Sequence, residues 1–94
     1  MDKNCVPRRR EDVLYRALRD GYTLYDTKSN KVHLLNLSAA YMWTCCDGGS
    51  SVAQIASRLH DDFDLGEQQS LGYVEDVIEG FFREELLCEN PTCV

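Results

Sequence analysis

The 94-residue sequence predicts a small α+β domain, in which a three-stranded antiparallel β-meander is followed by three α-helices in a winged-helix-like order. Three observations support this prediction. Residues 13–35 contain aromatic and β-branched runs between polar turns, which is typical of short strands. From residue 38 onward the apolar residues recur at helical spacing. A hydrophobic content of 44% and a charged content of 28% are ordinary for one globular domain.

The three predicted strands cover residues 13–18, 22–26 and 31–35. An Asp-Gly step at residues 20–21 separates the first two strands, and this dipeptide favours a tight hairpin turn because both residue types tolerate positive φ angles. The polar residues 27–30 form the second predicted turn. Consecutive strands joined by such short turns pair antiparallel, so the sequence predicts a small meander.

The first two predicted helices each follow a capping residue. Ser38 is placed to cap the first helix. The apolar face of this helix consists of Ala39, Met42, Trp43 and Cys46. The glycines in residues 47–49 end it. Ser51 and Gln54 then match a capping box, in which each side chain satisfies the other residue's backbone N–H. The second helix continues to the polar break at residues 61–66.

The third predicted helix covers residues 68–84 and has two contrasting faces. Its apolar face is wider than a single core contact needs and contains Leu71, Val74, Val77, Ile78, Phe81 and Phe82. Its acidic residues, with one that follows the helix, are Glu75, Asp76, Glu79, Glu84 and Glu85. We expect a flexible basic segment over residues 1–10, a folded domain over residues 11–87 and a C-terminal tail over residues 88–94.

The charges are distributed unevenly along the chain. Residues 1–20 carry six Lys/Arg against four Asp/Glu, whereas residues 47–94 carry two against eleven. Phosphate backbones attract clustered positive charge, so the acidic C-terminal half disfavours contact with DNA or RNA. We therefore expect no nucleic-acid partner. A winged-helix protein associated with transcription is kept as an alternative because the predicted fold is compatible with it.

The sequence has no feature of a membrane or secreted protein. No apolar run approaches the length of about 18 residues that a membrane-spanning helix needs. The N-terminal residues lack the hydrophobic stretch of a signal peptide. We expect a cytoplasmic protein that has no membrane contact.

The sequence contains five cysteines, at positions 5, 45, 46, 88 and 93. An odd number in a chain without a signal peptide argues against a disulfide framework. The spacing of the adjacent pair and of the two C-terminal cysteines does not match zinc-binding knuckles. We expect unpaired reduced thiols, with no metal and no cofactor. A thiol- or metal-sensing module is a second alternative.

The sequence provides no recognisable catalytic constellation. The glycines at residues 48–49 lack the Lys-Ser/Thr step of a phosphate-binding loop, and no His-Glu-x-x-His motif is present. A Cys/His nucleophile pair would need His33 or His60 beside one of the central cysteines, which nothing in the sequence predicts. We therefore expect no catalytic residues and no enzyme activity.

A binding module for a peptide or protein agrees better with these features. The third strand of an antiparallel meander leaves one side of its backbone unpaired, and an extended peptide can add there as a further strand. The wide apolar face of the third helix could supply pockets for the side chains of that peptide. The sequence therefore predicts a peptide-binding edge at residues 31–35.

The chain also resembles the PqqD-like family, whose members are called RiPP recognition elements. The similarity covers most of residues 11–87 and is strongest over residues 21–26, 32–43, 46–49 and 51–59. Its most specific parts are the Leu-Asn-x-Ser-Ala-x-x-x-Trp segment that begins at Leu35 and the Val-x-x-Ile-Ala-x-x-Leu helix that begins at Val52. The resemblance implies three strands and three helices, in agreement with the pattern above.

The resemblance further implies a role in the biosynthesis of ribosomally made peptide natural products. Members of the family bind the leader of a precursor peptide and present it to a modifying enzyme, such as a radical-SAM enzyme or the leader peptidase or cyclase of lasso-peptide systems. The leader pairs with the third strand and lies between that strand and the third helix. Carried over to this sequence, the implied peptide-binding residues are Lys31, Val32, His33, Leu34, Leu35, Leu71, Val74, Glu75, Ile78, Phe81 and Phe82.

Overall fold

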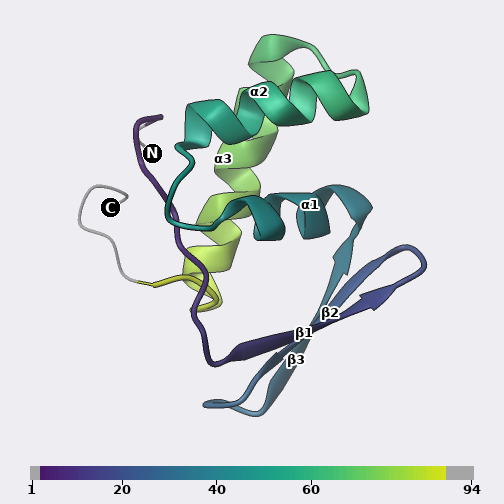
Figure 1. The fold of residues 1–94 in the computed structure, drawn as a ribbon, viewed down its shortest axis with the longest axis vertical. Helices are drawn as coiled ribbons and strands as arrows, with labels where there is room; N and C mark the ends of the chain where they lie inside the picture. Colours follow the sequence, from purple (N-terminus) through teal and green to yellow (C-terminus); the bar gives the residue numbers. More distant parts are fainter. Residues whose placement is uncertain (1–2, 89–94) are drawn as a thin grey trace.

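The computed structural model describes residues 3–88 and confirms the predicted α+β order of three strands and three helices (Figure 1). The elements are β1 Val13–Leu18, β2 Gly21–Asp26, β3 Lys31–Asn36, α1 Leu37–Cys45, α2 Val52–Phe63 and α3 Glu67–Arg83. The helix α1 contacts β2 and β3, and α2 and α3 pack against α1 and against each other. The helices therefore gather on one side of the sheet (Figure 1).

The sheet is an antiparallel meander in the order β1-β2-β3, so that β1 and β3 are its two edges. The turn between β1 and β2 contains residues 19 and 20, and Gly21 is the first residue of β2 rather than part of the turn. Gly21 has a φ of +153°, and a Cβ atom there would lie 1.7 Å from the carbonyl oxygen of Leu35. A glycine is required at this position because β3 approaches the backbone so closely.

The helix α1 follows β3 without a loop. Its N-cap is Asn36, two residues before the predicted Ser38. The Asn36 side chain accepts a hydrogen bond from the backbone N–H of Ala39 at 2.9 Å. The Ser38 hydroxyl is instead 2.6 Å from the Tyr73 hydroxyl on α3. The capping box of α2 is confirmed, since the backbone N–H of Gln54 donates to the Ser51 hydroxyl and that of Ser51 donates to the Gln54 side chain.

The hydrophobic core lies between the three helices and the sheet. Trp43 of α1 is its largest residue, only 1% exposed, and its ring packs edge-to-face on Phe81 of α3 with the ring centroids 5.8 Å apart. Such aromatic pairs add about 1 kcal/mol to the burial of their area. The other fully buried large side chains are Leu24, Met42, Ile55, Leu59, Ile78, Leu86, Val52 and Val74. The core thus joins every helix to the central strand.

The N-terminal segment differs from the flexible segment expected over residues 1–10. Cys5 and Pro7 are buried, and the backbone N–H of Val52 donates to the Cys5 carbonyl at 2.8 Å. The backbone N–H of Arg9 donates to the Cys46 carbonyl at 2.8 Å. The described part of the segment, residues 3–10, therefore packs on the ends of α1 and α2 because its backbone groups find partners there.

The C-terminal segment is held in the same way where the structure describes it. The backbone N–H of Cys88 donates to the Arg8 carbonyl at 2.8 Å, and Leu87 forms an isolated β-bridge with Arg9. Cys88, the first residue of the expected tail, therefore still pairs with the N-terminal segment. The remainder of that tail, residues 89–94, lies outside the described residues.

Arg10 joins the N-terminal segment to the sheet through a buried ion pair. Its guanidinium donates to both carboxylate oxygens of Asp26, at 3.0 and 3.2 Å, and the Asp26 side chain is 3% exposed. Asp26 also accepts from the backbone N–H groups of Lys28 and Ser29, which shapes the turn before β3. Burial by itself raises the pKa of Asp26, but the bonds from Arg10 and from these amides outweigh it and lower the pKa to about 2.

We expect an Asp26→Asn variant to unfold at a lower temperature than the wild type at about pH 7 and to lose most of that difference near pH 2. The folded-state pKa of about 2 lies below the ordinary value of 3.8. The stability from the ionised carboxylate is therefore present above pH 3.8 and is lost as the pH falls toward 2. Thermal unfolding across this range measures the effect. Asp61→Asn, an exposed substitution on α2, is the control, and equal acid profiles for Asp26→Asn and wild type would contradict the prediction.

Candidate functional site

The edge strand β3 presents more exposed apolar surface than its central neighbour β2. Leu34 and Val32 are 76% and 61% exposed, Lys31 is exposed, and His33 and Leu35 are half-buried. Within residues 3–88, β3 pairs with β2 on one side and with no strand on the other. Its outer backbone groups are therefore available to an additional strand.

The side chains of β3 alternate between the two faces of the sheet. His33 lies opposite Leu24, which is fully buried, so His33 and Leu35 point toward the helical side. Val32 and Leu34 point to the opposite face. The Nε2 atom of His33 is buried and has no hydrogen-bond partner among residues 3–88. The strand thus offers one unpartnered polar atom on its helical side and two exposed aliphatic side chains on the other.

Three of the predicted site residues on α3 are not accessible. Val74 and Ile78 are fully buried, Phe81 is 4% exposed, and all three belong to the hydrophobic core. Their spacing along the helix places them on the face that packs against the rest of the protein. The prediction that they line a peptide groove is corrected on this point, because a bound peptide could reach them only if the core opened.

The other predicted residues on α3 lie in different places. Leu71, half-buried, lines a hollow shared with α2 and Lys3, on the side of α3 away from β3. Glu75 is half-buried one turn further along the same side. Phe82 lines a hollow of about 460 Å³ together with Lys28 and Ser29 of the turn before β3. The structure therefore brings Phe82 close to the beginning of β3 and does not bring Leu71 there.

The sequence prediction omitted an α3 residue that lies close to the end of β3. The hydroxyl of Tyr73 is 2.6 Å from that of Ser38, the second residue after β3. Val77 lies one helical turn after Tyr73 on the same face, and both side chains are half-buried. The i, i+4 spacing of Tyr73 and Val77 in the sequence indicates a shared helix face, but the longer apolar row through Val74 and Ile78 is the stronger signal for the face of α3 that binds.

Two hollows lie at the two ends of β3. The first is the hollow that contains Phe82, beside the turn before the strand. The second has a volume of about 400 Å³ and is formed by residues 34–36 of β3 together with the turn between β1 and β2. Both hollows include residues of β2, Asp26 in the first and Gly21 in the second, so they lie at the ends of the sheet rather than along the free edge of β3.

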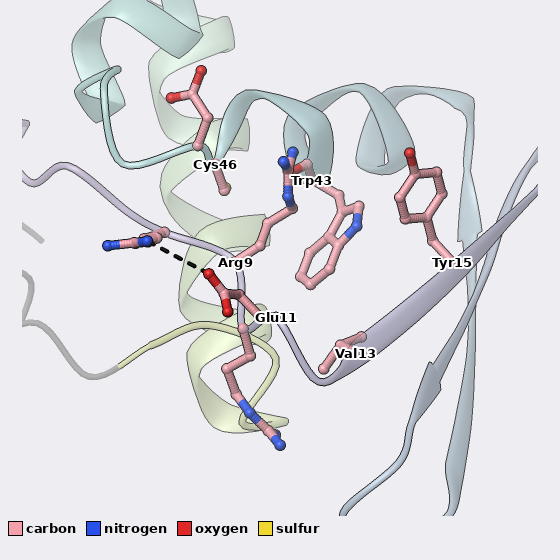
Figure 2. A pocket seen from close by; sticks show the side chains of 9 residues that line it. Arg9, Glu11, Val13, Tyr15, Trp43 and Cys46 are labelled. Atoms are coloured by element: carbon pink, nitrogen blue, oxygen red, sulfur yellow. Dashed lines mark hydrogen bonds and ion pairs between the residues drawn. The ribbon is translucent and has the colours of Figure 1, made fainter.

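A further hollow of about 320 Å³ lies beside the other edge strand, between the N-terminal segment, β1 and α1. Figure 2 shows Trp43, Tyr15 and Arg9 around it. Its arginines are engaged within the protein. Arg9 donates to the backbone carbonyl of Thr44 at 2.7 Å, and Arg8 pairs with Glu11 at 3.8 Å. Because these cations already have partners, the hollow is a structural junction rather than an anion site.

Two cysteines at the end of α1 and the start of the following loop are buried. Burial and the neighbouring Cys45 raise the pKa of the Cys46 thiol above its ordinary value, and its Sγ donates to the Met42 carbonyl at 3.1 Å. A thiol that stays protonated and bonded in the core is a poor nucleophile and a poor metal ligand. Among the described residues, no three His, Cys, Asp or Glu side chains gather as a metal site.

The expectation of unpaired thiols holds for three of the described cysteines, Cys45, Cys46 and Cys88. It is wrong for Cys5, which is buried and disulfide-bonded. Cys93 lies outside the described residues. Within residues 3–88, no helix is both long enough and apolar enough to cross a membrane.

The fold and the site define a class of protein, a winged-helix-like α+β domain with an open strand edge whose C-terminal end is close to Tyr73 of the last helix. The family model described as coenzyme PQQ synthesis protein D (PqqD) matches residues 21–87, and the chain belongs to this family. No curated protein matches the chain.

Two solved structures are similar to this chain. One is described as TbiB1 in complex with the TbiA(beta) leader peptide, with 13% identity, a TM-score of 0.79, and coverage of 88% of this chain and 96% of that one. The other is described as lasso peptide synthetase B1 complexed with the leader peptide, with 18% identity, a TM-score of 0.79, and coverage of 90% and 100%. At these identities the likeness establishes the shared fold.

Proposed function

We propose that this protein is a non-catalytic peptide chaperone that binds the leader of a ribosomally synthesised precursor peptide. The observation that carries the proposal is the open edge of β3, where Leu34 is 76% exposed and the outer backbone groups are available. Two further facts support it. The chain belongs to the PqqD family, and two proteins with the same fold have been solved as complexes with leader peptides.

In the proposed complex the leader adds to β3 as a fourth strand. Backbone hydrogen bonds to residues 31–35 supply affinity that does not depend on sequence, and side-chain pockets supply selectivity. Leader side chains on the helical side would contact His33 and Leu35 from β3 and Tyr73 and Val77 from α3. We expect a dissociation constant between about 1 μM and tens of nanomolar.

The bound leader would increase the local concentration of the precursor near its modifying enzyme. Capture of the precursor by the enzyme then becomes intramolecular, which raises the rate without any catalytic group in this chain. We propose that this enzyme is a radical-SAM enzyme or the leader peptidase or cyclase of a lasso-peptide system. We also propose a cytoplasmic location. Neither the family match nor the two similar structures supports a function in transcription.

An NMR titration of the labelled protein with the leader of the precursor encoded beside it tests the proposal. We expect saturable amide shifts along β3 and along the Tyr73–Val77 side of α3, because an added strand changes the hydrogen bonding of the edge. A scrambled leader of the same composition is the control. Equal responses to both peptides, or saturable shifts confined to α2, would contradict leader recognition at β3.

A further inference from the structure

The face of the sheet that points away from the helices is apolar and exposed. Five side chains from all three strands form this surface, here called the outer sheet face. They are Leu14 (56% exposed), Leu18 (49%), Tyr25 (39%), Val32 (61%) and Leu34 (76%). Isolated exposed apolar residues are common, but a group of five on one face of a small domain marks an interaction surface.

The strand register makes this face continuous. Leu14, Tyr25 and Val32 lie opposite one another in a single row across the sheet. Arg16 and Leu34 lie on either side of Thr23 in the next row toward the β1–β2 turn. Because alternate residues of a strand share a face, these side chains adjoin one another and none points toward the helices. The outer sheet face therefore extends from the edge strand β1 to the edge strand β3.

The charges around this face differ from those of the rest of the chain. Residues 13–36 contain four Lys/Arg, namely Arg16, Arg19, Lys28 and Lys31, and two Asp, although the chain as a whole has a net charge of −6. One of the two acids, Asp26, is neutralised by Arg10. Of these cations, Arg16 lies on the outer sheet face and Arg19 lies in the turn beside Leu18, whereas Lys31 shares the opposite face with His33. The surface is thus an apolar group with arginines at its β1 side, which complements a partner whose apolar patch is bordered by carboxylates. A second copy of this chain would bring like charges together.

The outer sheet face is also continuous with the proposed leader site, because Val32 and Leu34 belong to both. A leader strand added to β3 would enlarge the face, since every second leader side chain would point outward beside Leu34. A partner that docks on this face would therefore touch the domain and its bound leader together. Binding of leader and partner would then be coupled, each increasing the affinity of the other by the same factor.

We propose that the outer sheet face is the docking surface for the modifying enzyme, which meets it with an apolar patch bordered by carboxylates. This inference rests on the proposed function, since the enzyme is defined by its action on the leader-bearing precursor. The surface lies beyond the groove between β3 and α3, so enzyme docking and leader binding are separable by substitution.

The test uses the purified modifying enzyme encoded beside this chain and measures its affinity for the domain with and without leader. We expect Leu14→Asp to weaken enzyme binding by at least about tenfold while the leader affinity stays within about twofold, because Leu14 is on β1, two strands away from the leader edge. Arg16→Glu, also on β1, should weaken enzyme binding most at low salt. Arg58→Glu, an exposed charge reversal on α2, is the matched control and should change neither affinity.

The possible outcomes separate this inference from the proposed function. If both β1 variants bound the leader and the enzyme with wild-type affinity, the proposed docking surface would be wrong and the proposed function would be unaffected. Absence of leader binding by the wild type would overturn both. A wild-type dimer that Leu14→Asp dissociates would assign the face to a second copy and overturn the inference. Because Leu14 and Arg16 are exposed, we expect both variants to fold, which NMR spectra check.

Discussion

A Leu34→Pro substitution is expected to reduce leader affinity by at least about 100-fold, the combined effect of a missing N–H donor and a distorted edge. Leu34 lies at the middle of β3, opposite Thr23. Proline cannot donate a hydrogen bond, and its ring crowds the chain that approaches the strand. Because Leu34 is 76% exposed, the substitution removes little packing from the core. Calorimetric titration with the leader measures the loss.

Two further proline variants make this result decisive. Neighbouring N–H groups of a strand point to opposite sides. One of the two variants, Leu34→Pro or His33→Pro, therefore removes a donor to the leader, and the other removes a donor to β2. Arg16→Pro places the same residue on the other edge, in the same cross-strand row, and should leave leader binding intact. If folded Leu34→Pro and folded His33→Pro both bound the leader as the wild type does, strand addition at β3 would be wrong.

The arrangement of the elements could be predicted because its signals are local. The change from strand to helical spacing at the end of β3 and the capping box at Ser51 each depend on residues a few positions apart. Even so, the cap of α1 moved from Ser38 to Asn36, because a helix that follows a strand without a loop begins at the first residue able to cap it. Only the three-dimensional path of the chain decides between two such neighbouring candidates.

The packing of the N-terminal segment could not be predicted in this way. Its contacts are backbone hydrogen bonds between residues far apart in sequence, such as that from Arg9 to Cys46, and backbone groups carry no sequence signal. From the sequence alone, the basic run at residues 8–10, which acidic residues follow, indicates a solvated segment. In the structure one of its arginines, Arg10, forms the buried pair with Asp26 that supports the turn before β3. The segment thus belongs to the scaffold of the proposed site.

The sequence also does not predict which side of α3 faces β3. Hydrophobic spacing identifies the buried face of a helix, and here it identified Val74, Ile78 and Phe81 correctly as one row. Spacing does not indicate which flank of that row borders the sheet and which borders α2. The contact between Tyr73 and Ser38 favours the Tyr73 flank, because Ser38 is the second residue after β3. The flank that contains Leu71 and Glu75 therefore lies on the other side.

This assignment leads to the second large effect, which is expected for Val77→Arg. Val77 is half-buried on the flank of α3 that contains Tyr73, and a long charged side chain there would occupy the space that the leader needs. We expect leader affinity to fall by at least about 30-fold, since a desolvated or displaced charge in an apolar groove costs about 2 kcal/mol or more. Titration of the folded variant with the leader measures the change.

Leu71→Arg is the matched control, because Leu71 is equally half-buried on the same helix but lines the hollow shared with α2. A general loss of helix packing would weaken the leader affinity of both variants alike, whereas a groove on the Tyr73 side is affected by Val77→Arg alone. If Leu71→Arg abolished binding and Val77→Arg did not, the leader would lie along the opposite flank of α3. It would then be too far from β3 for the strand and the helix to contact one peptide together, and the proposed site would have to be divided in two.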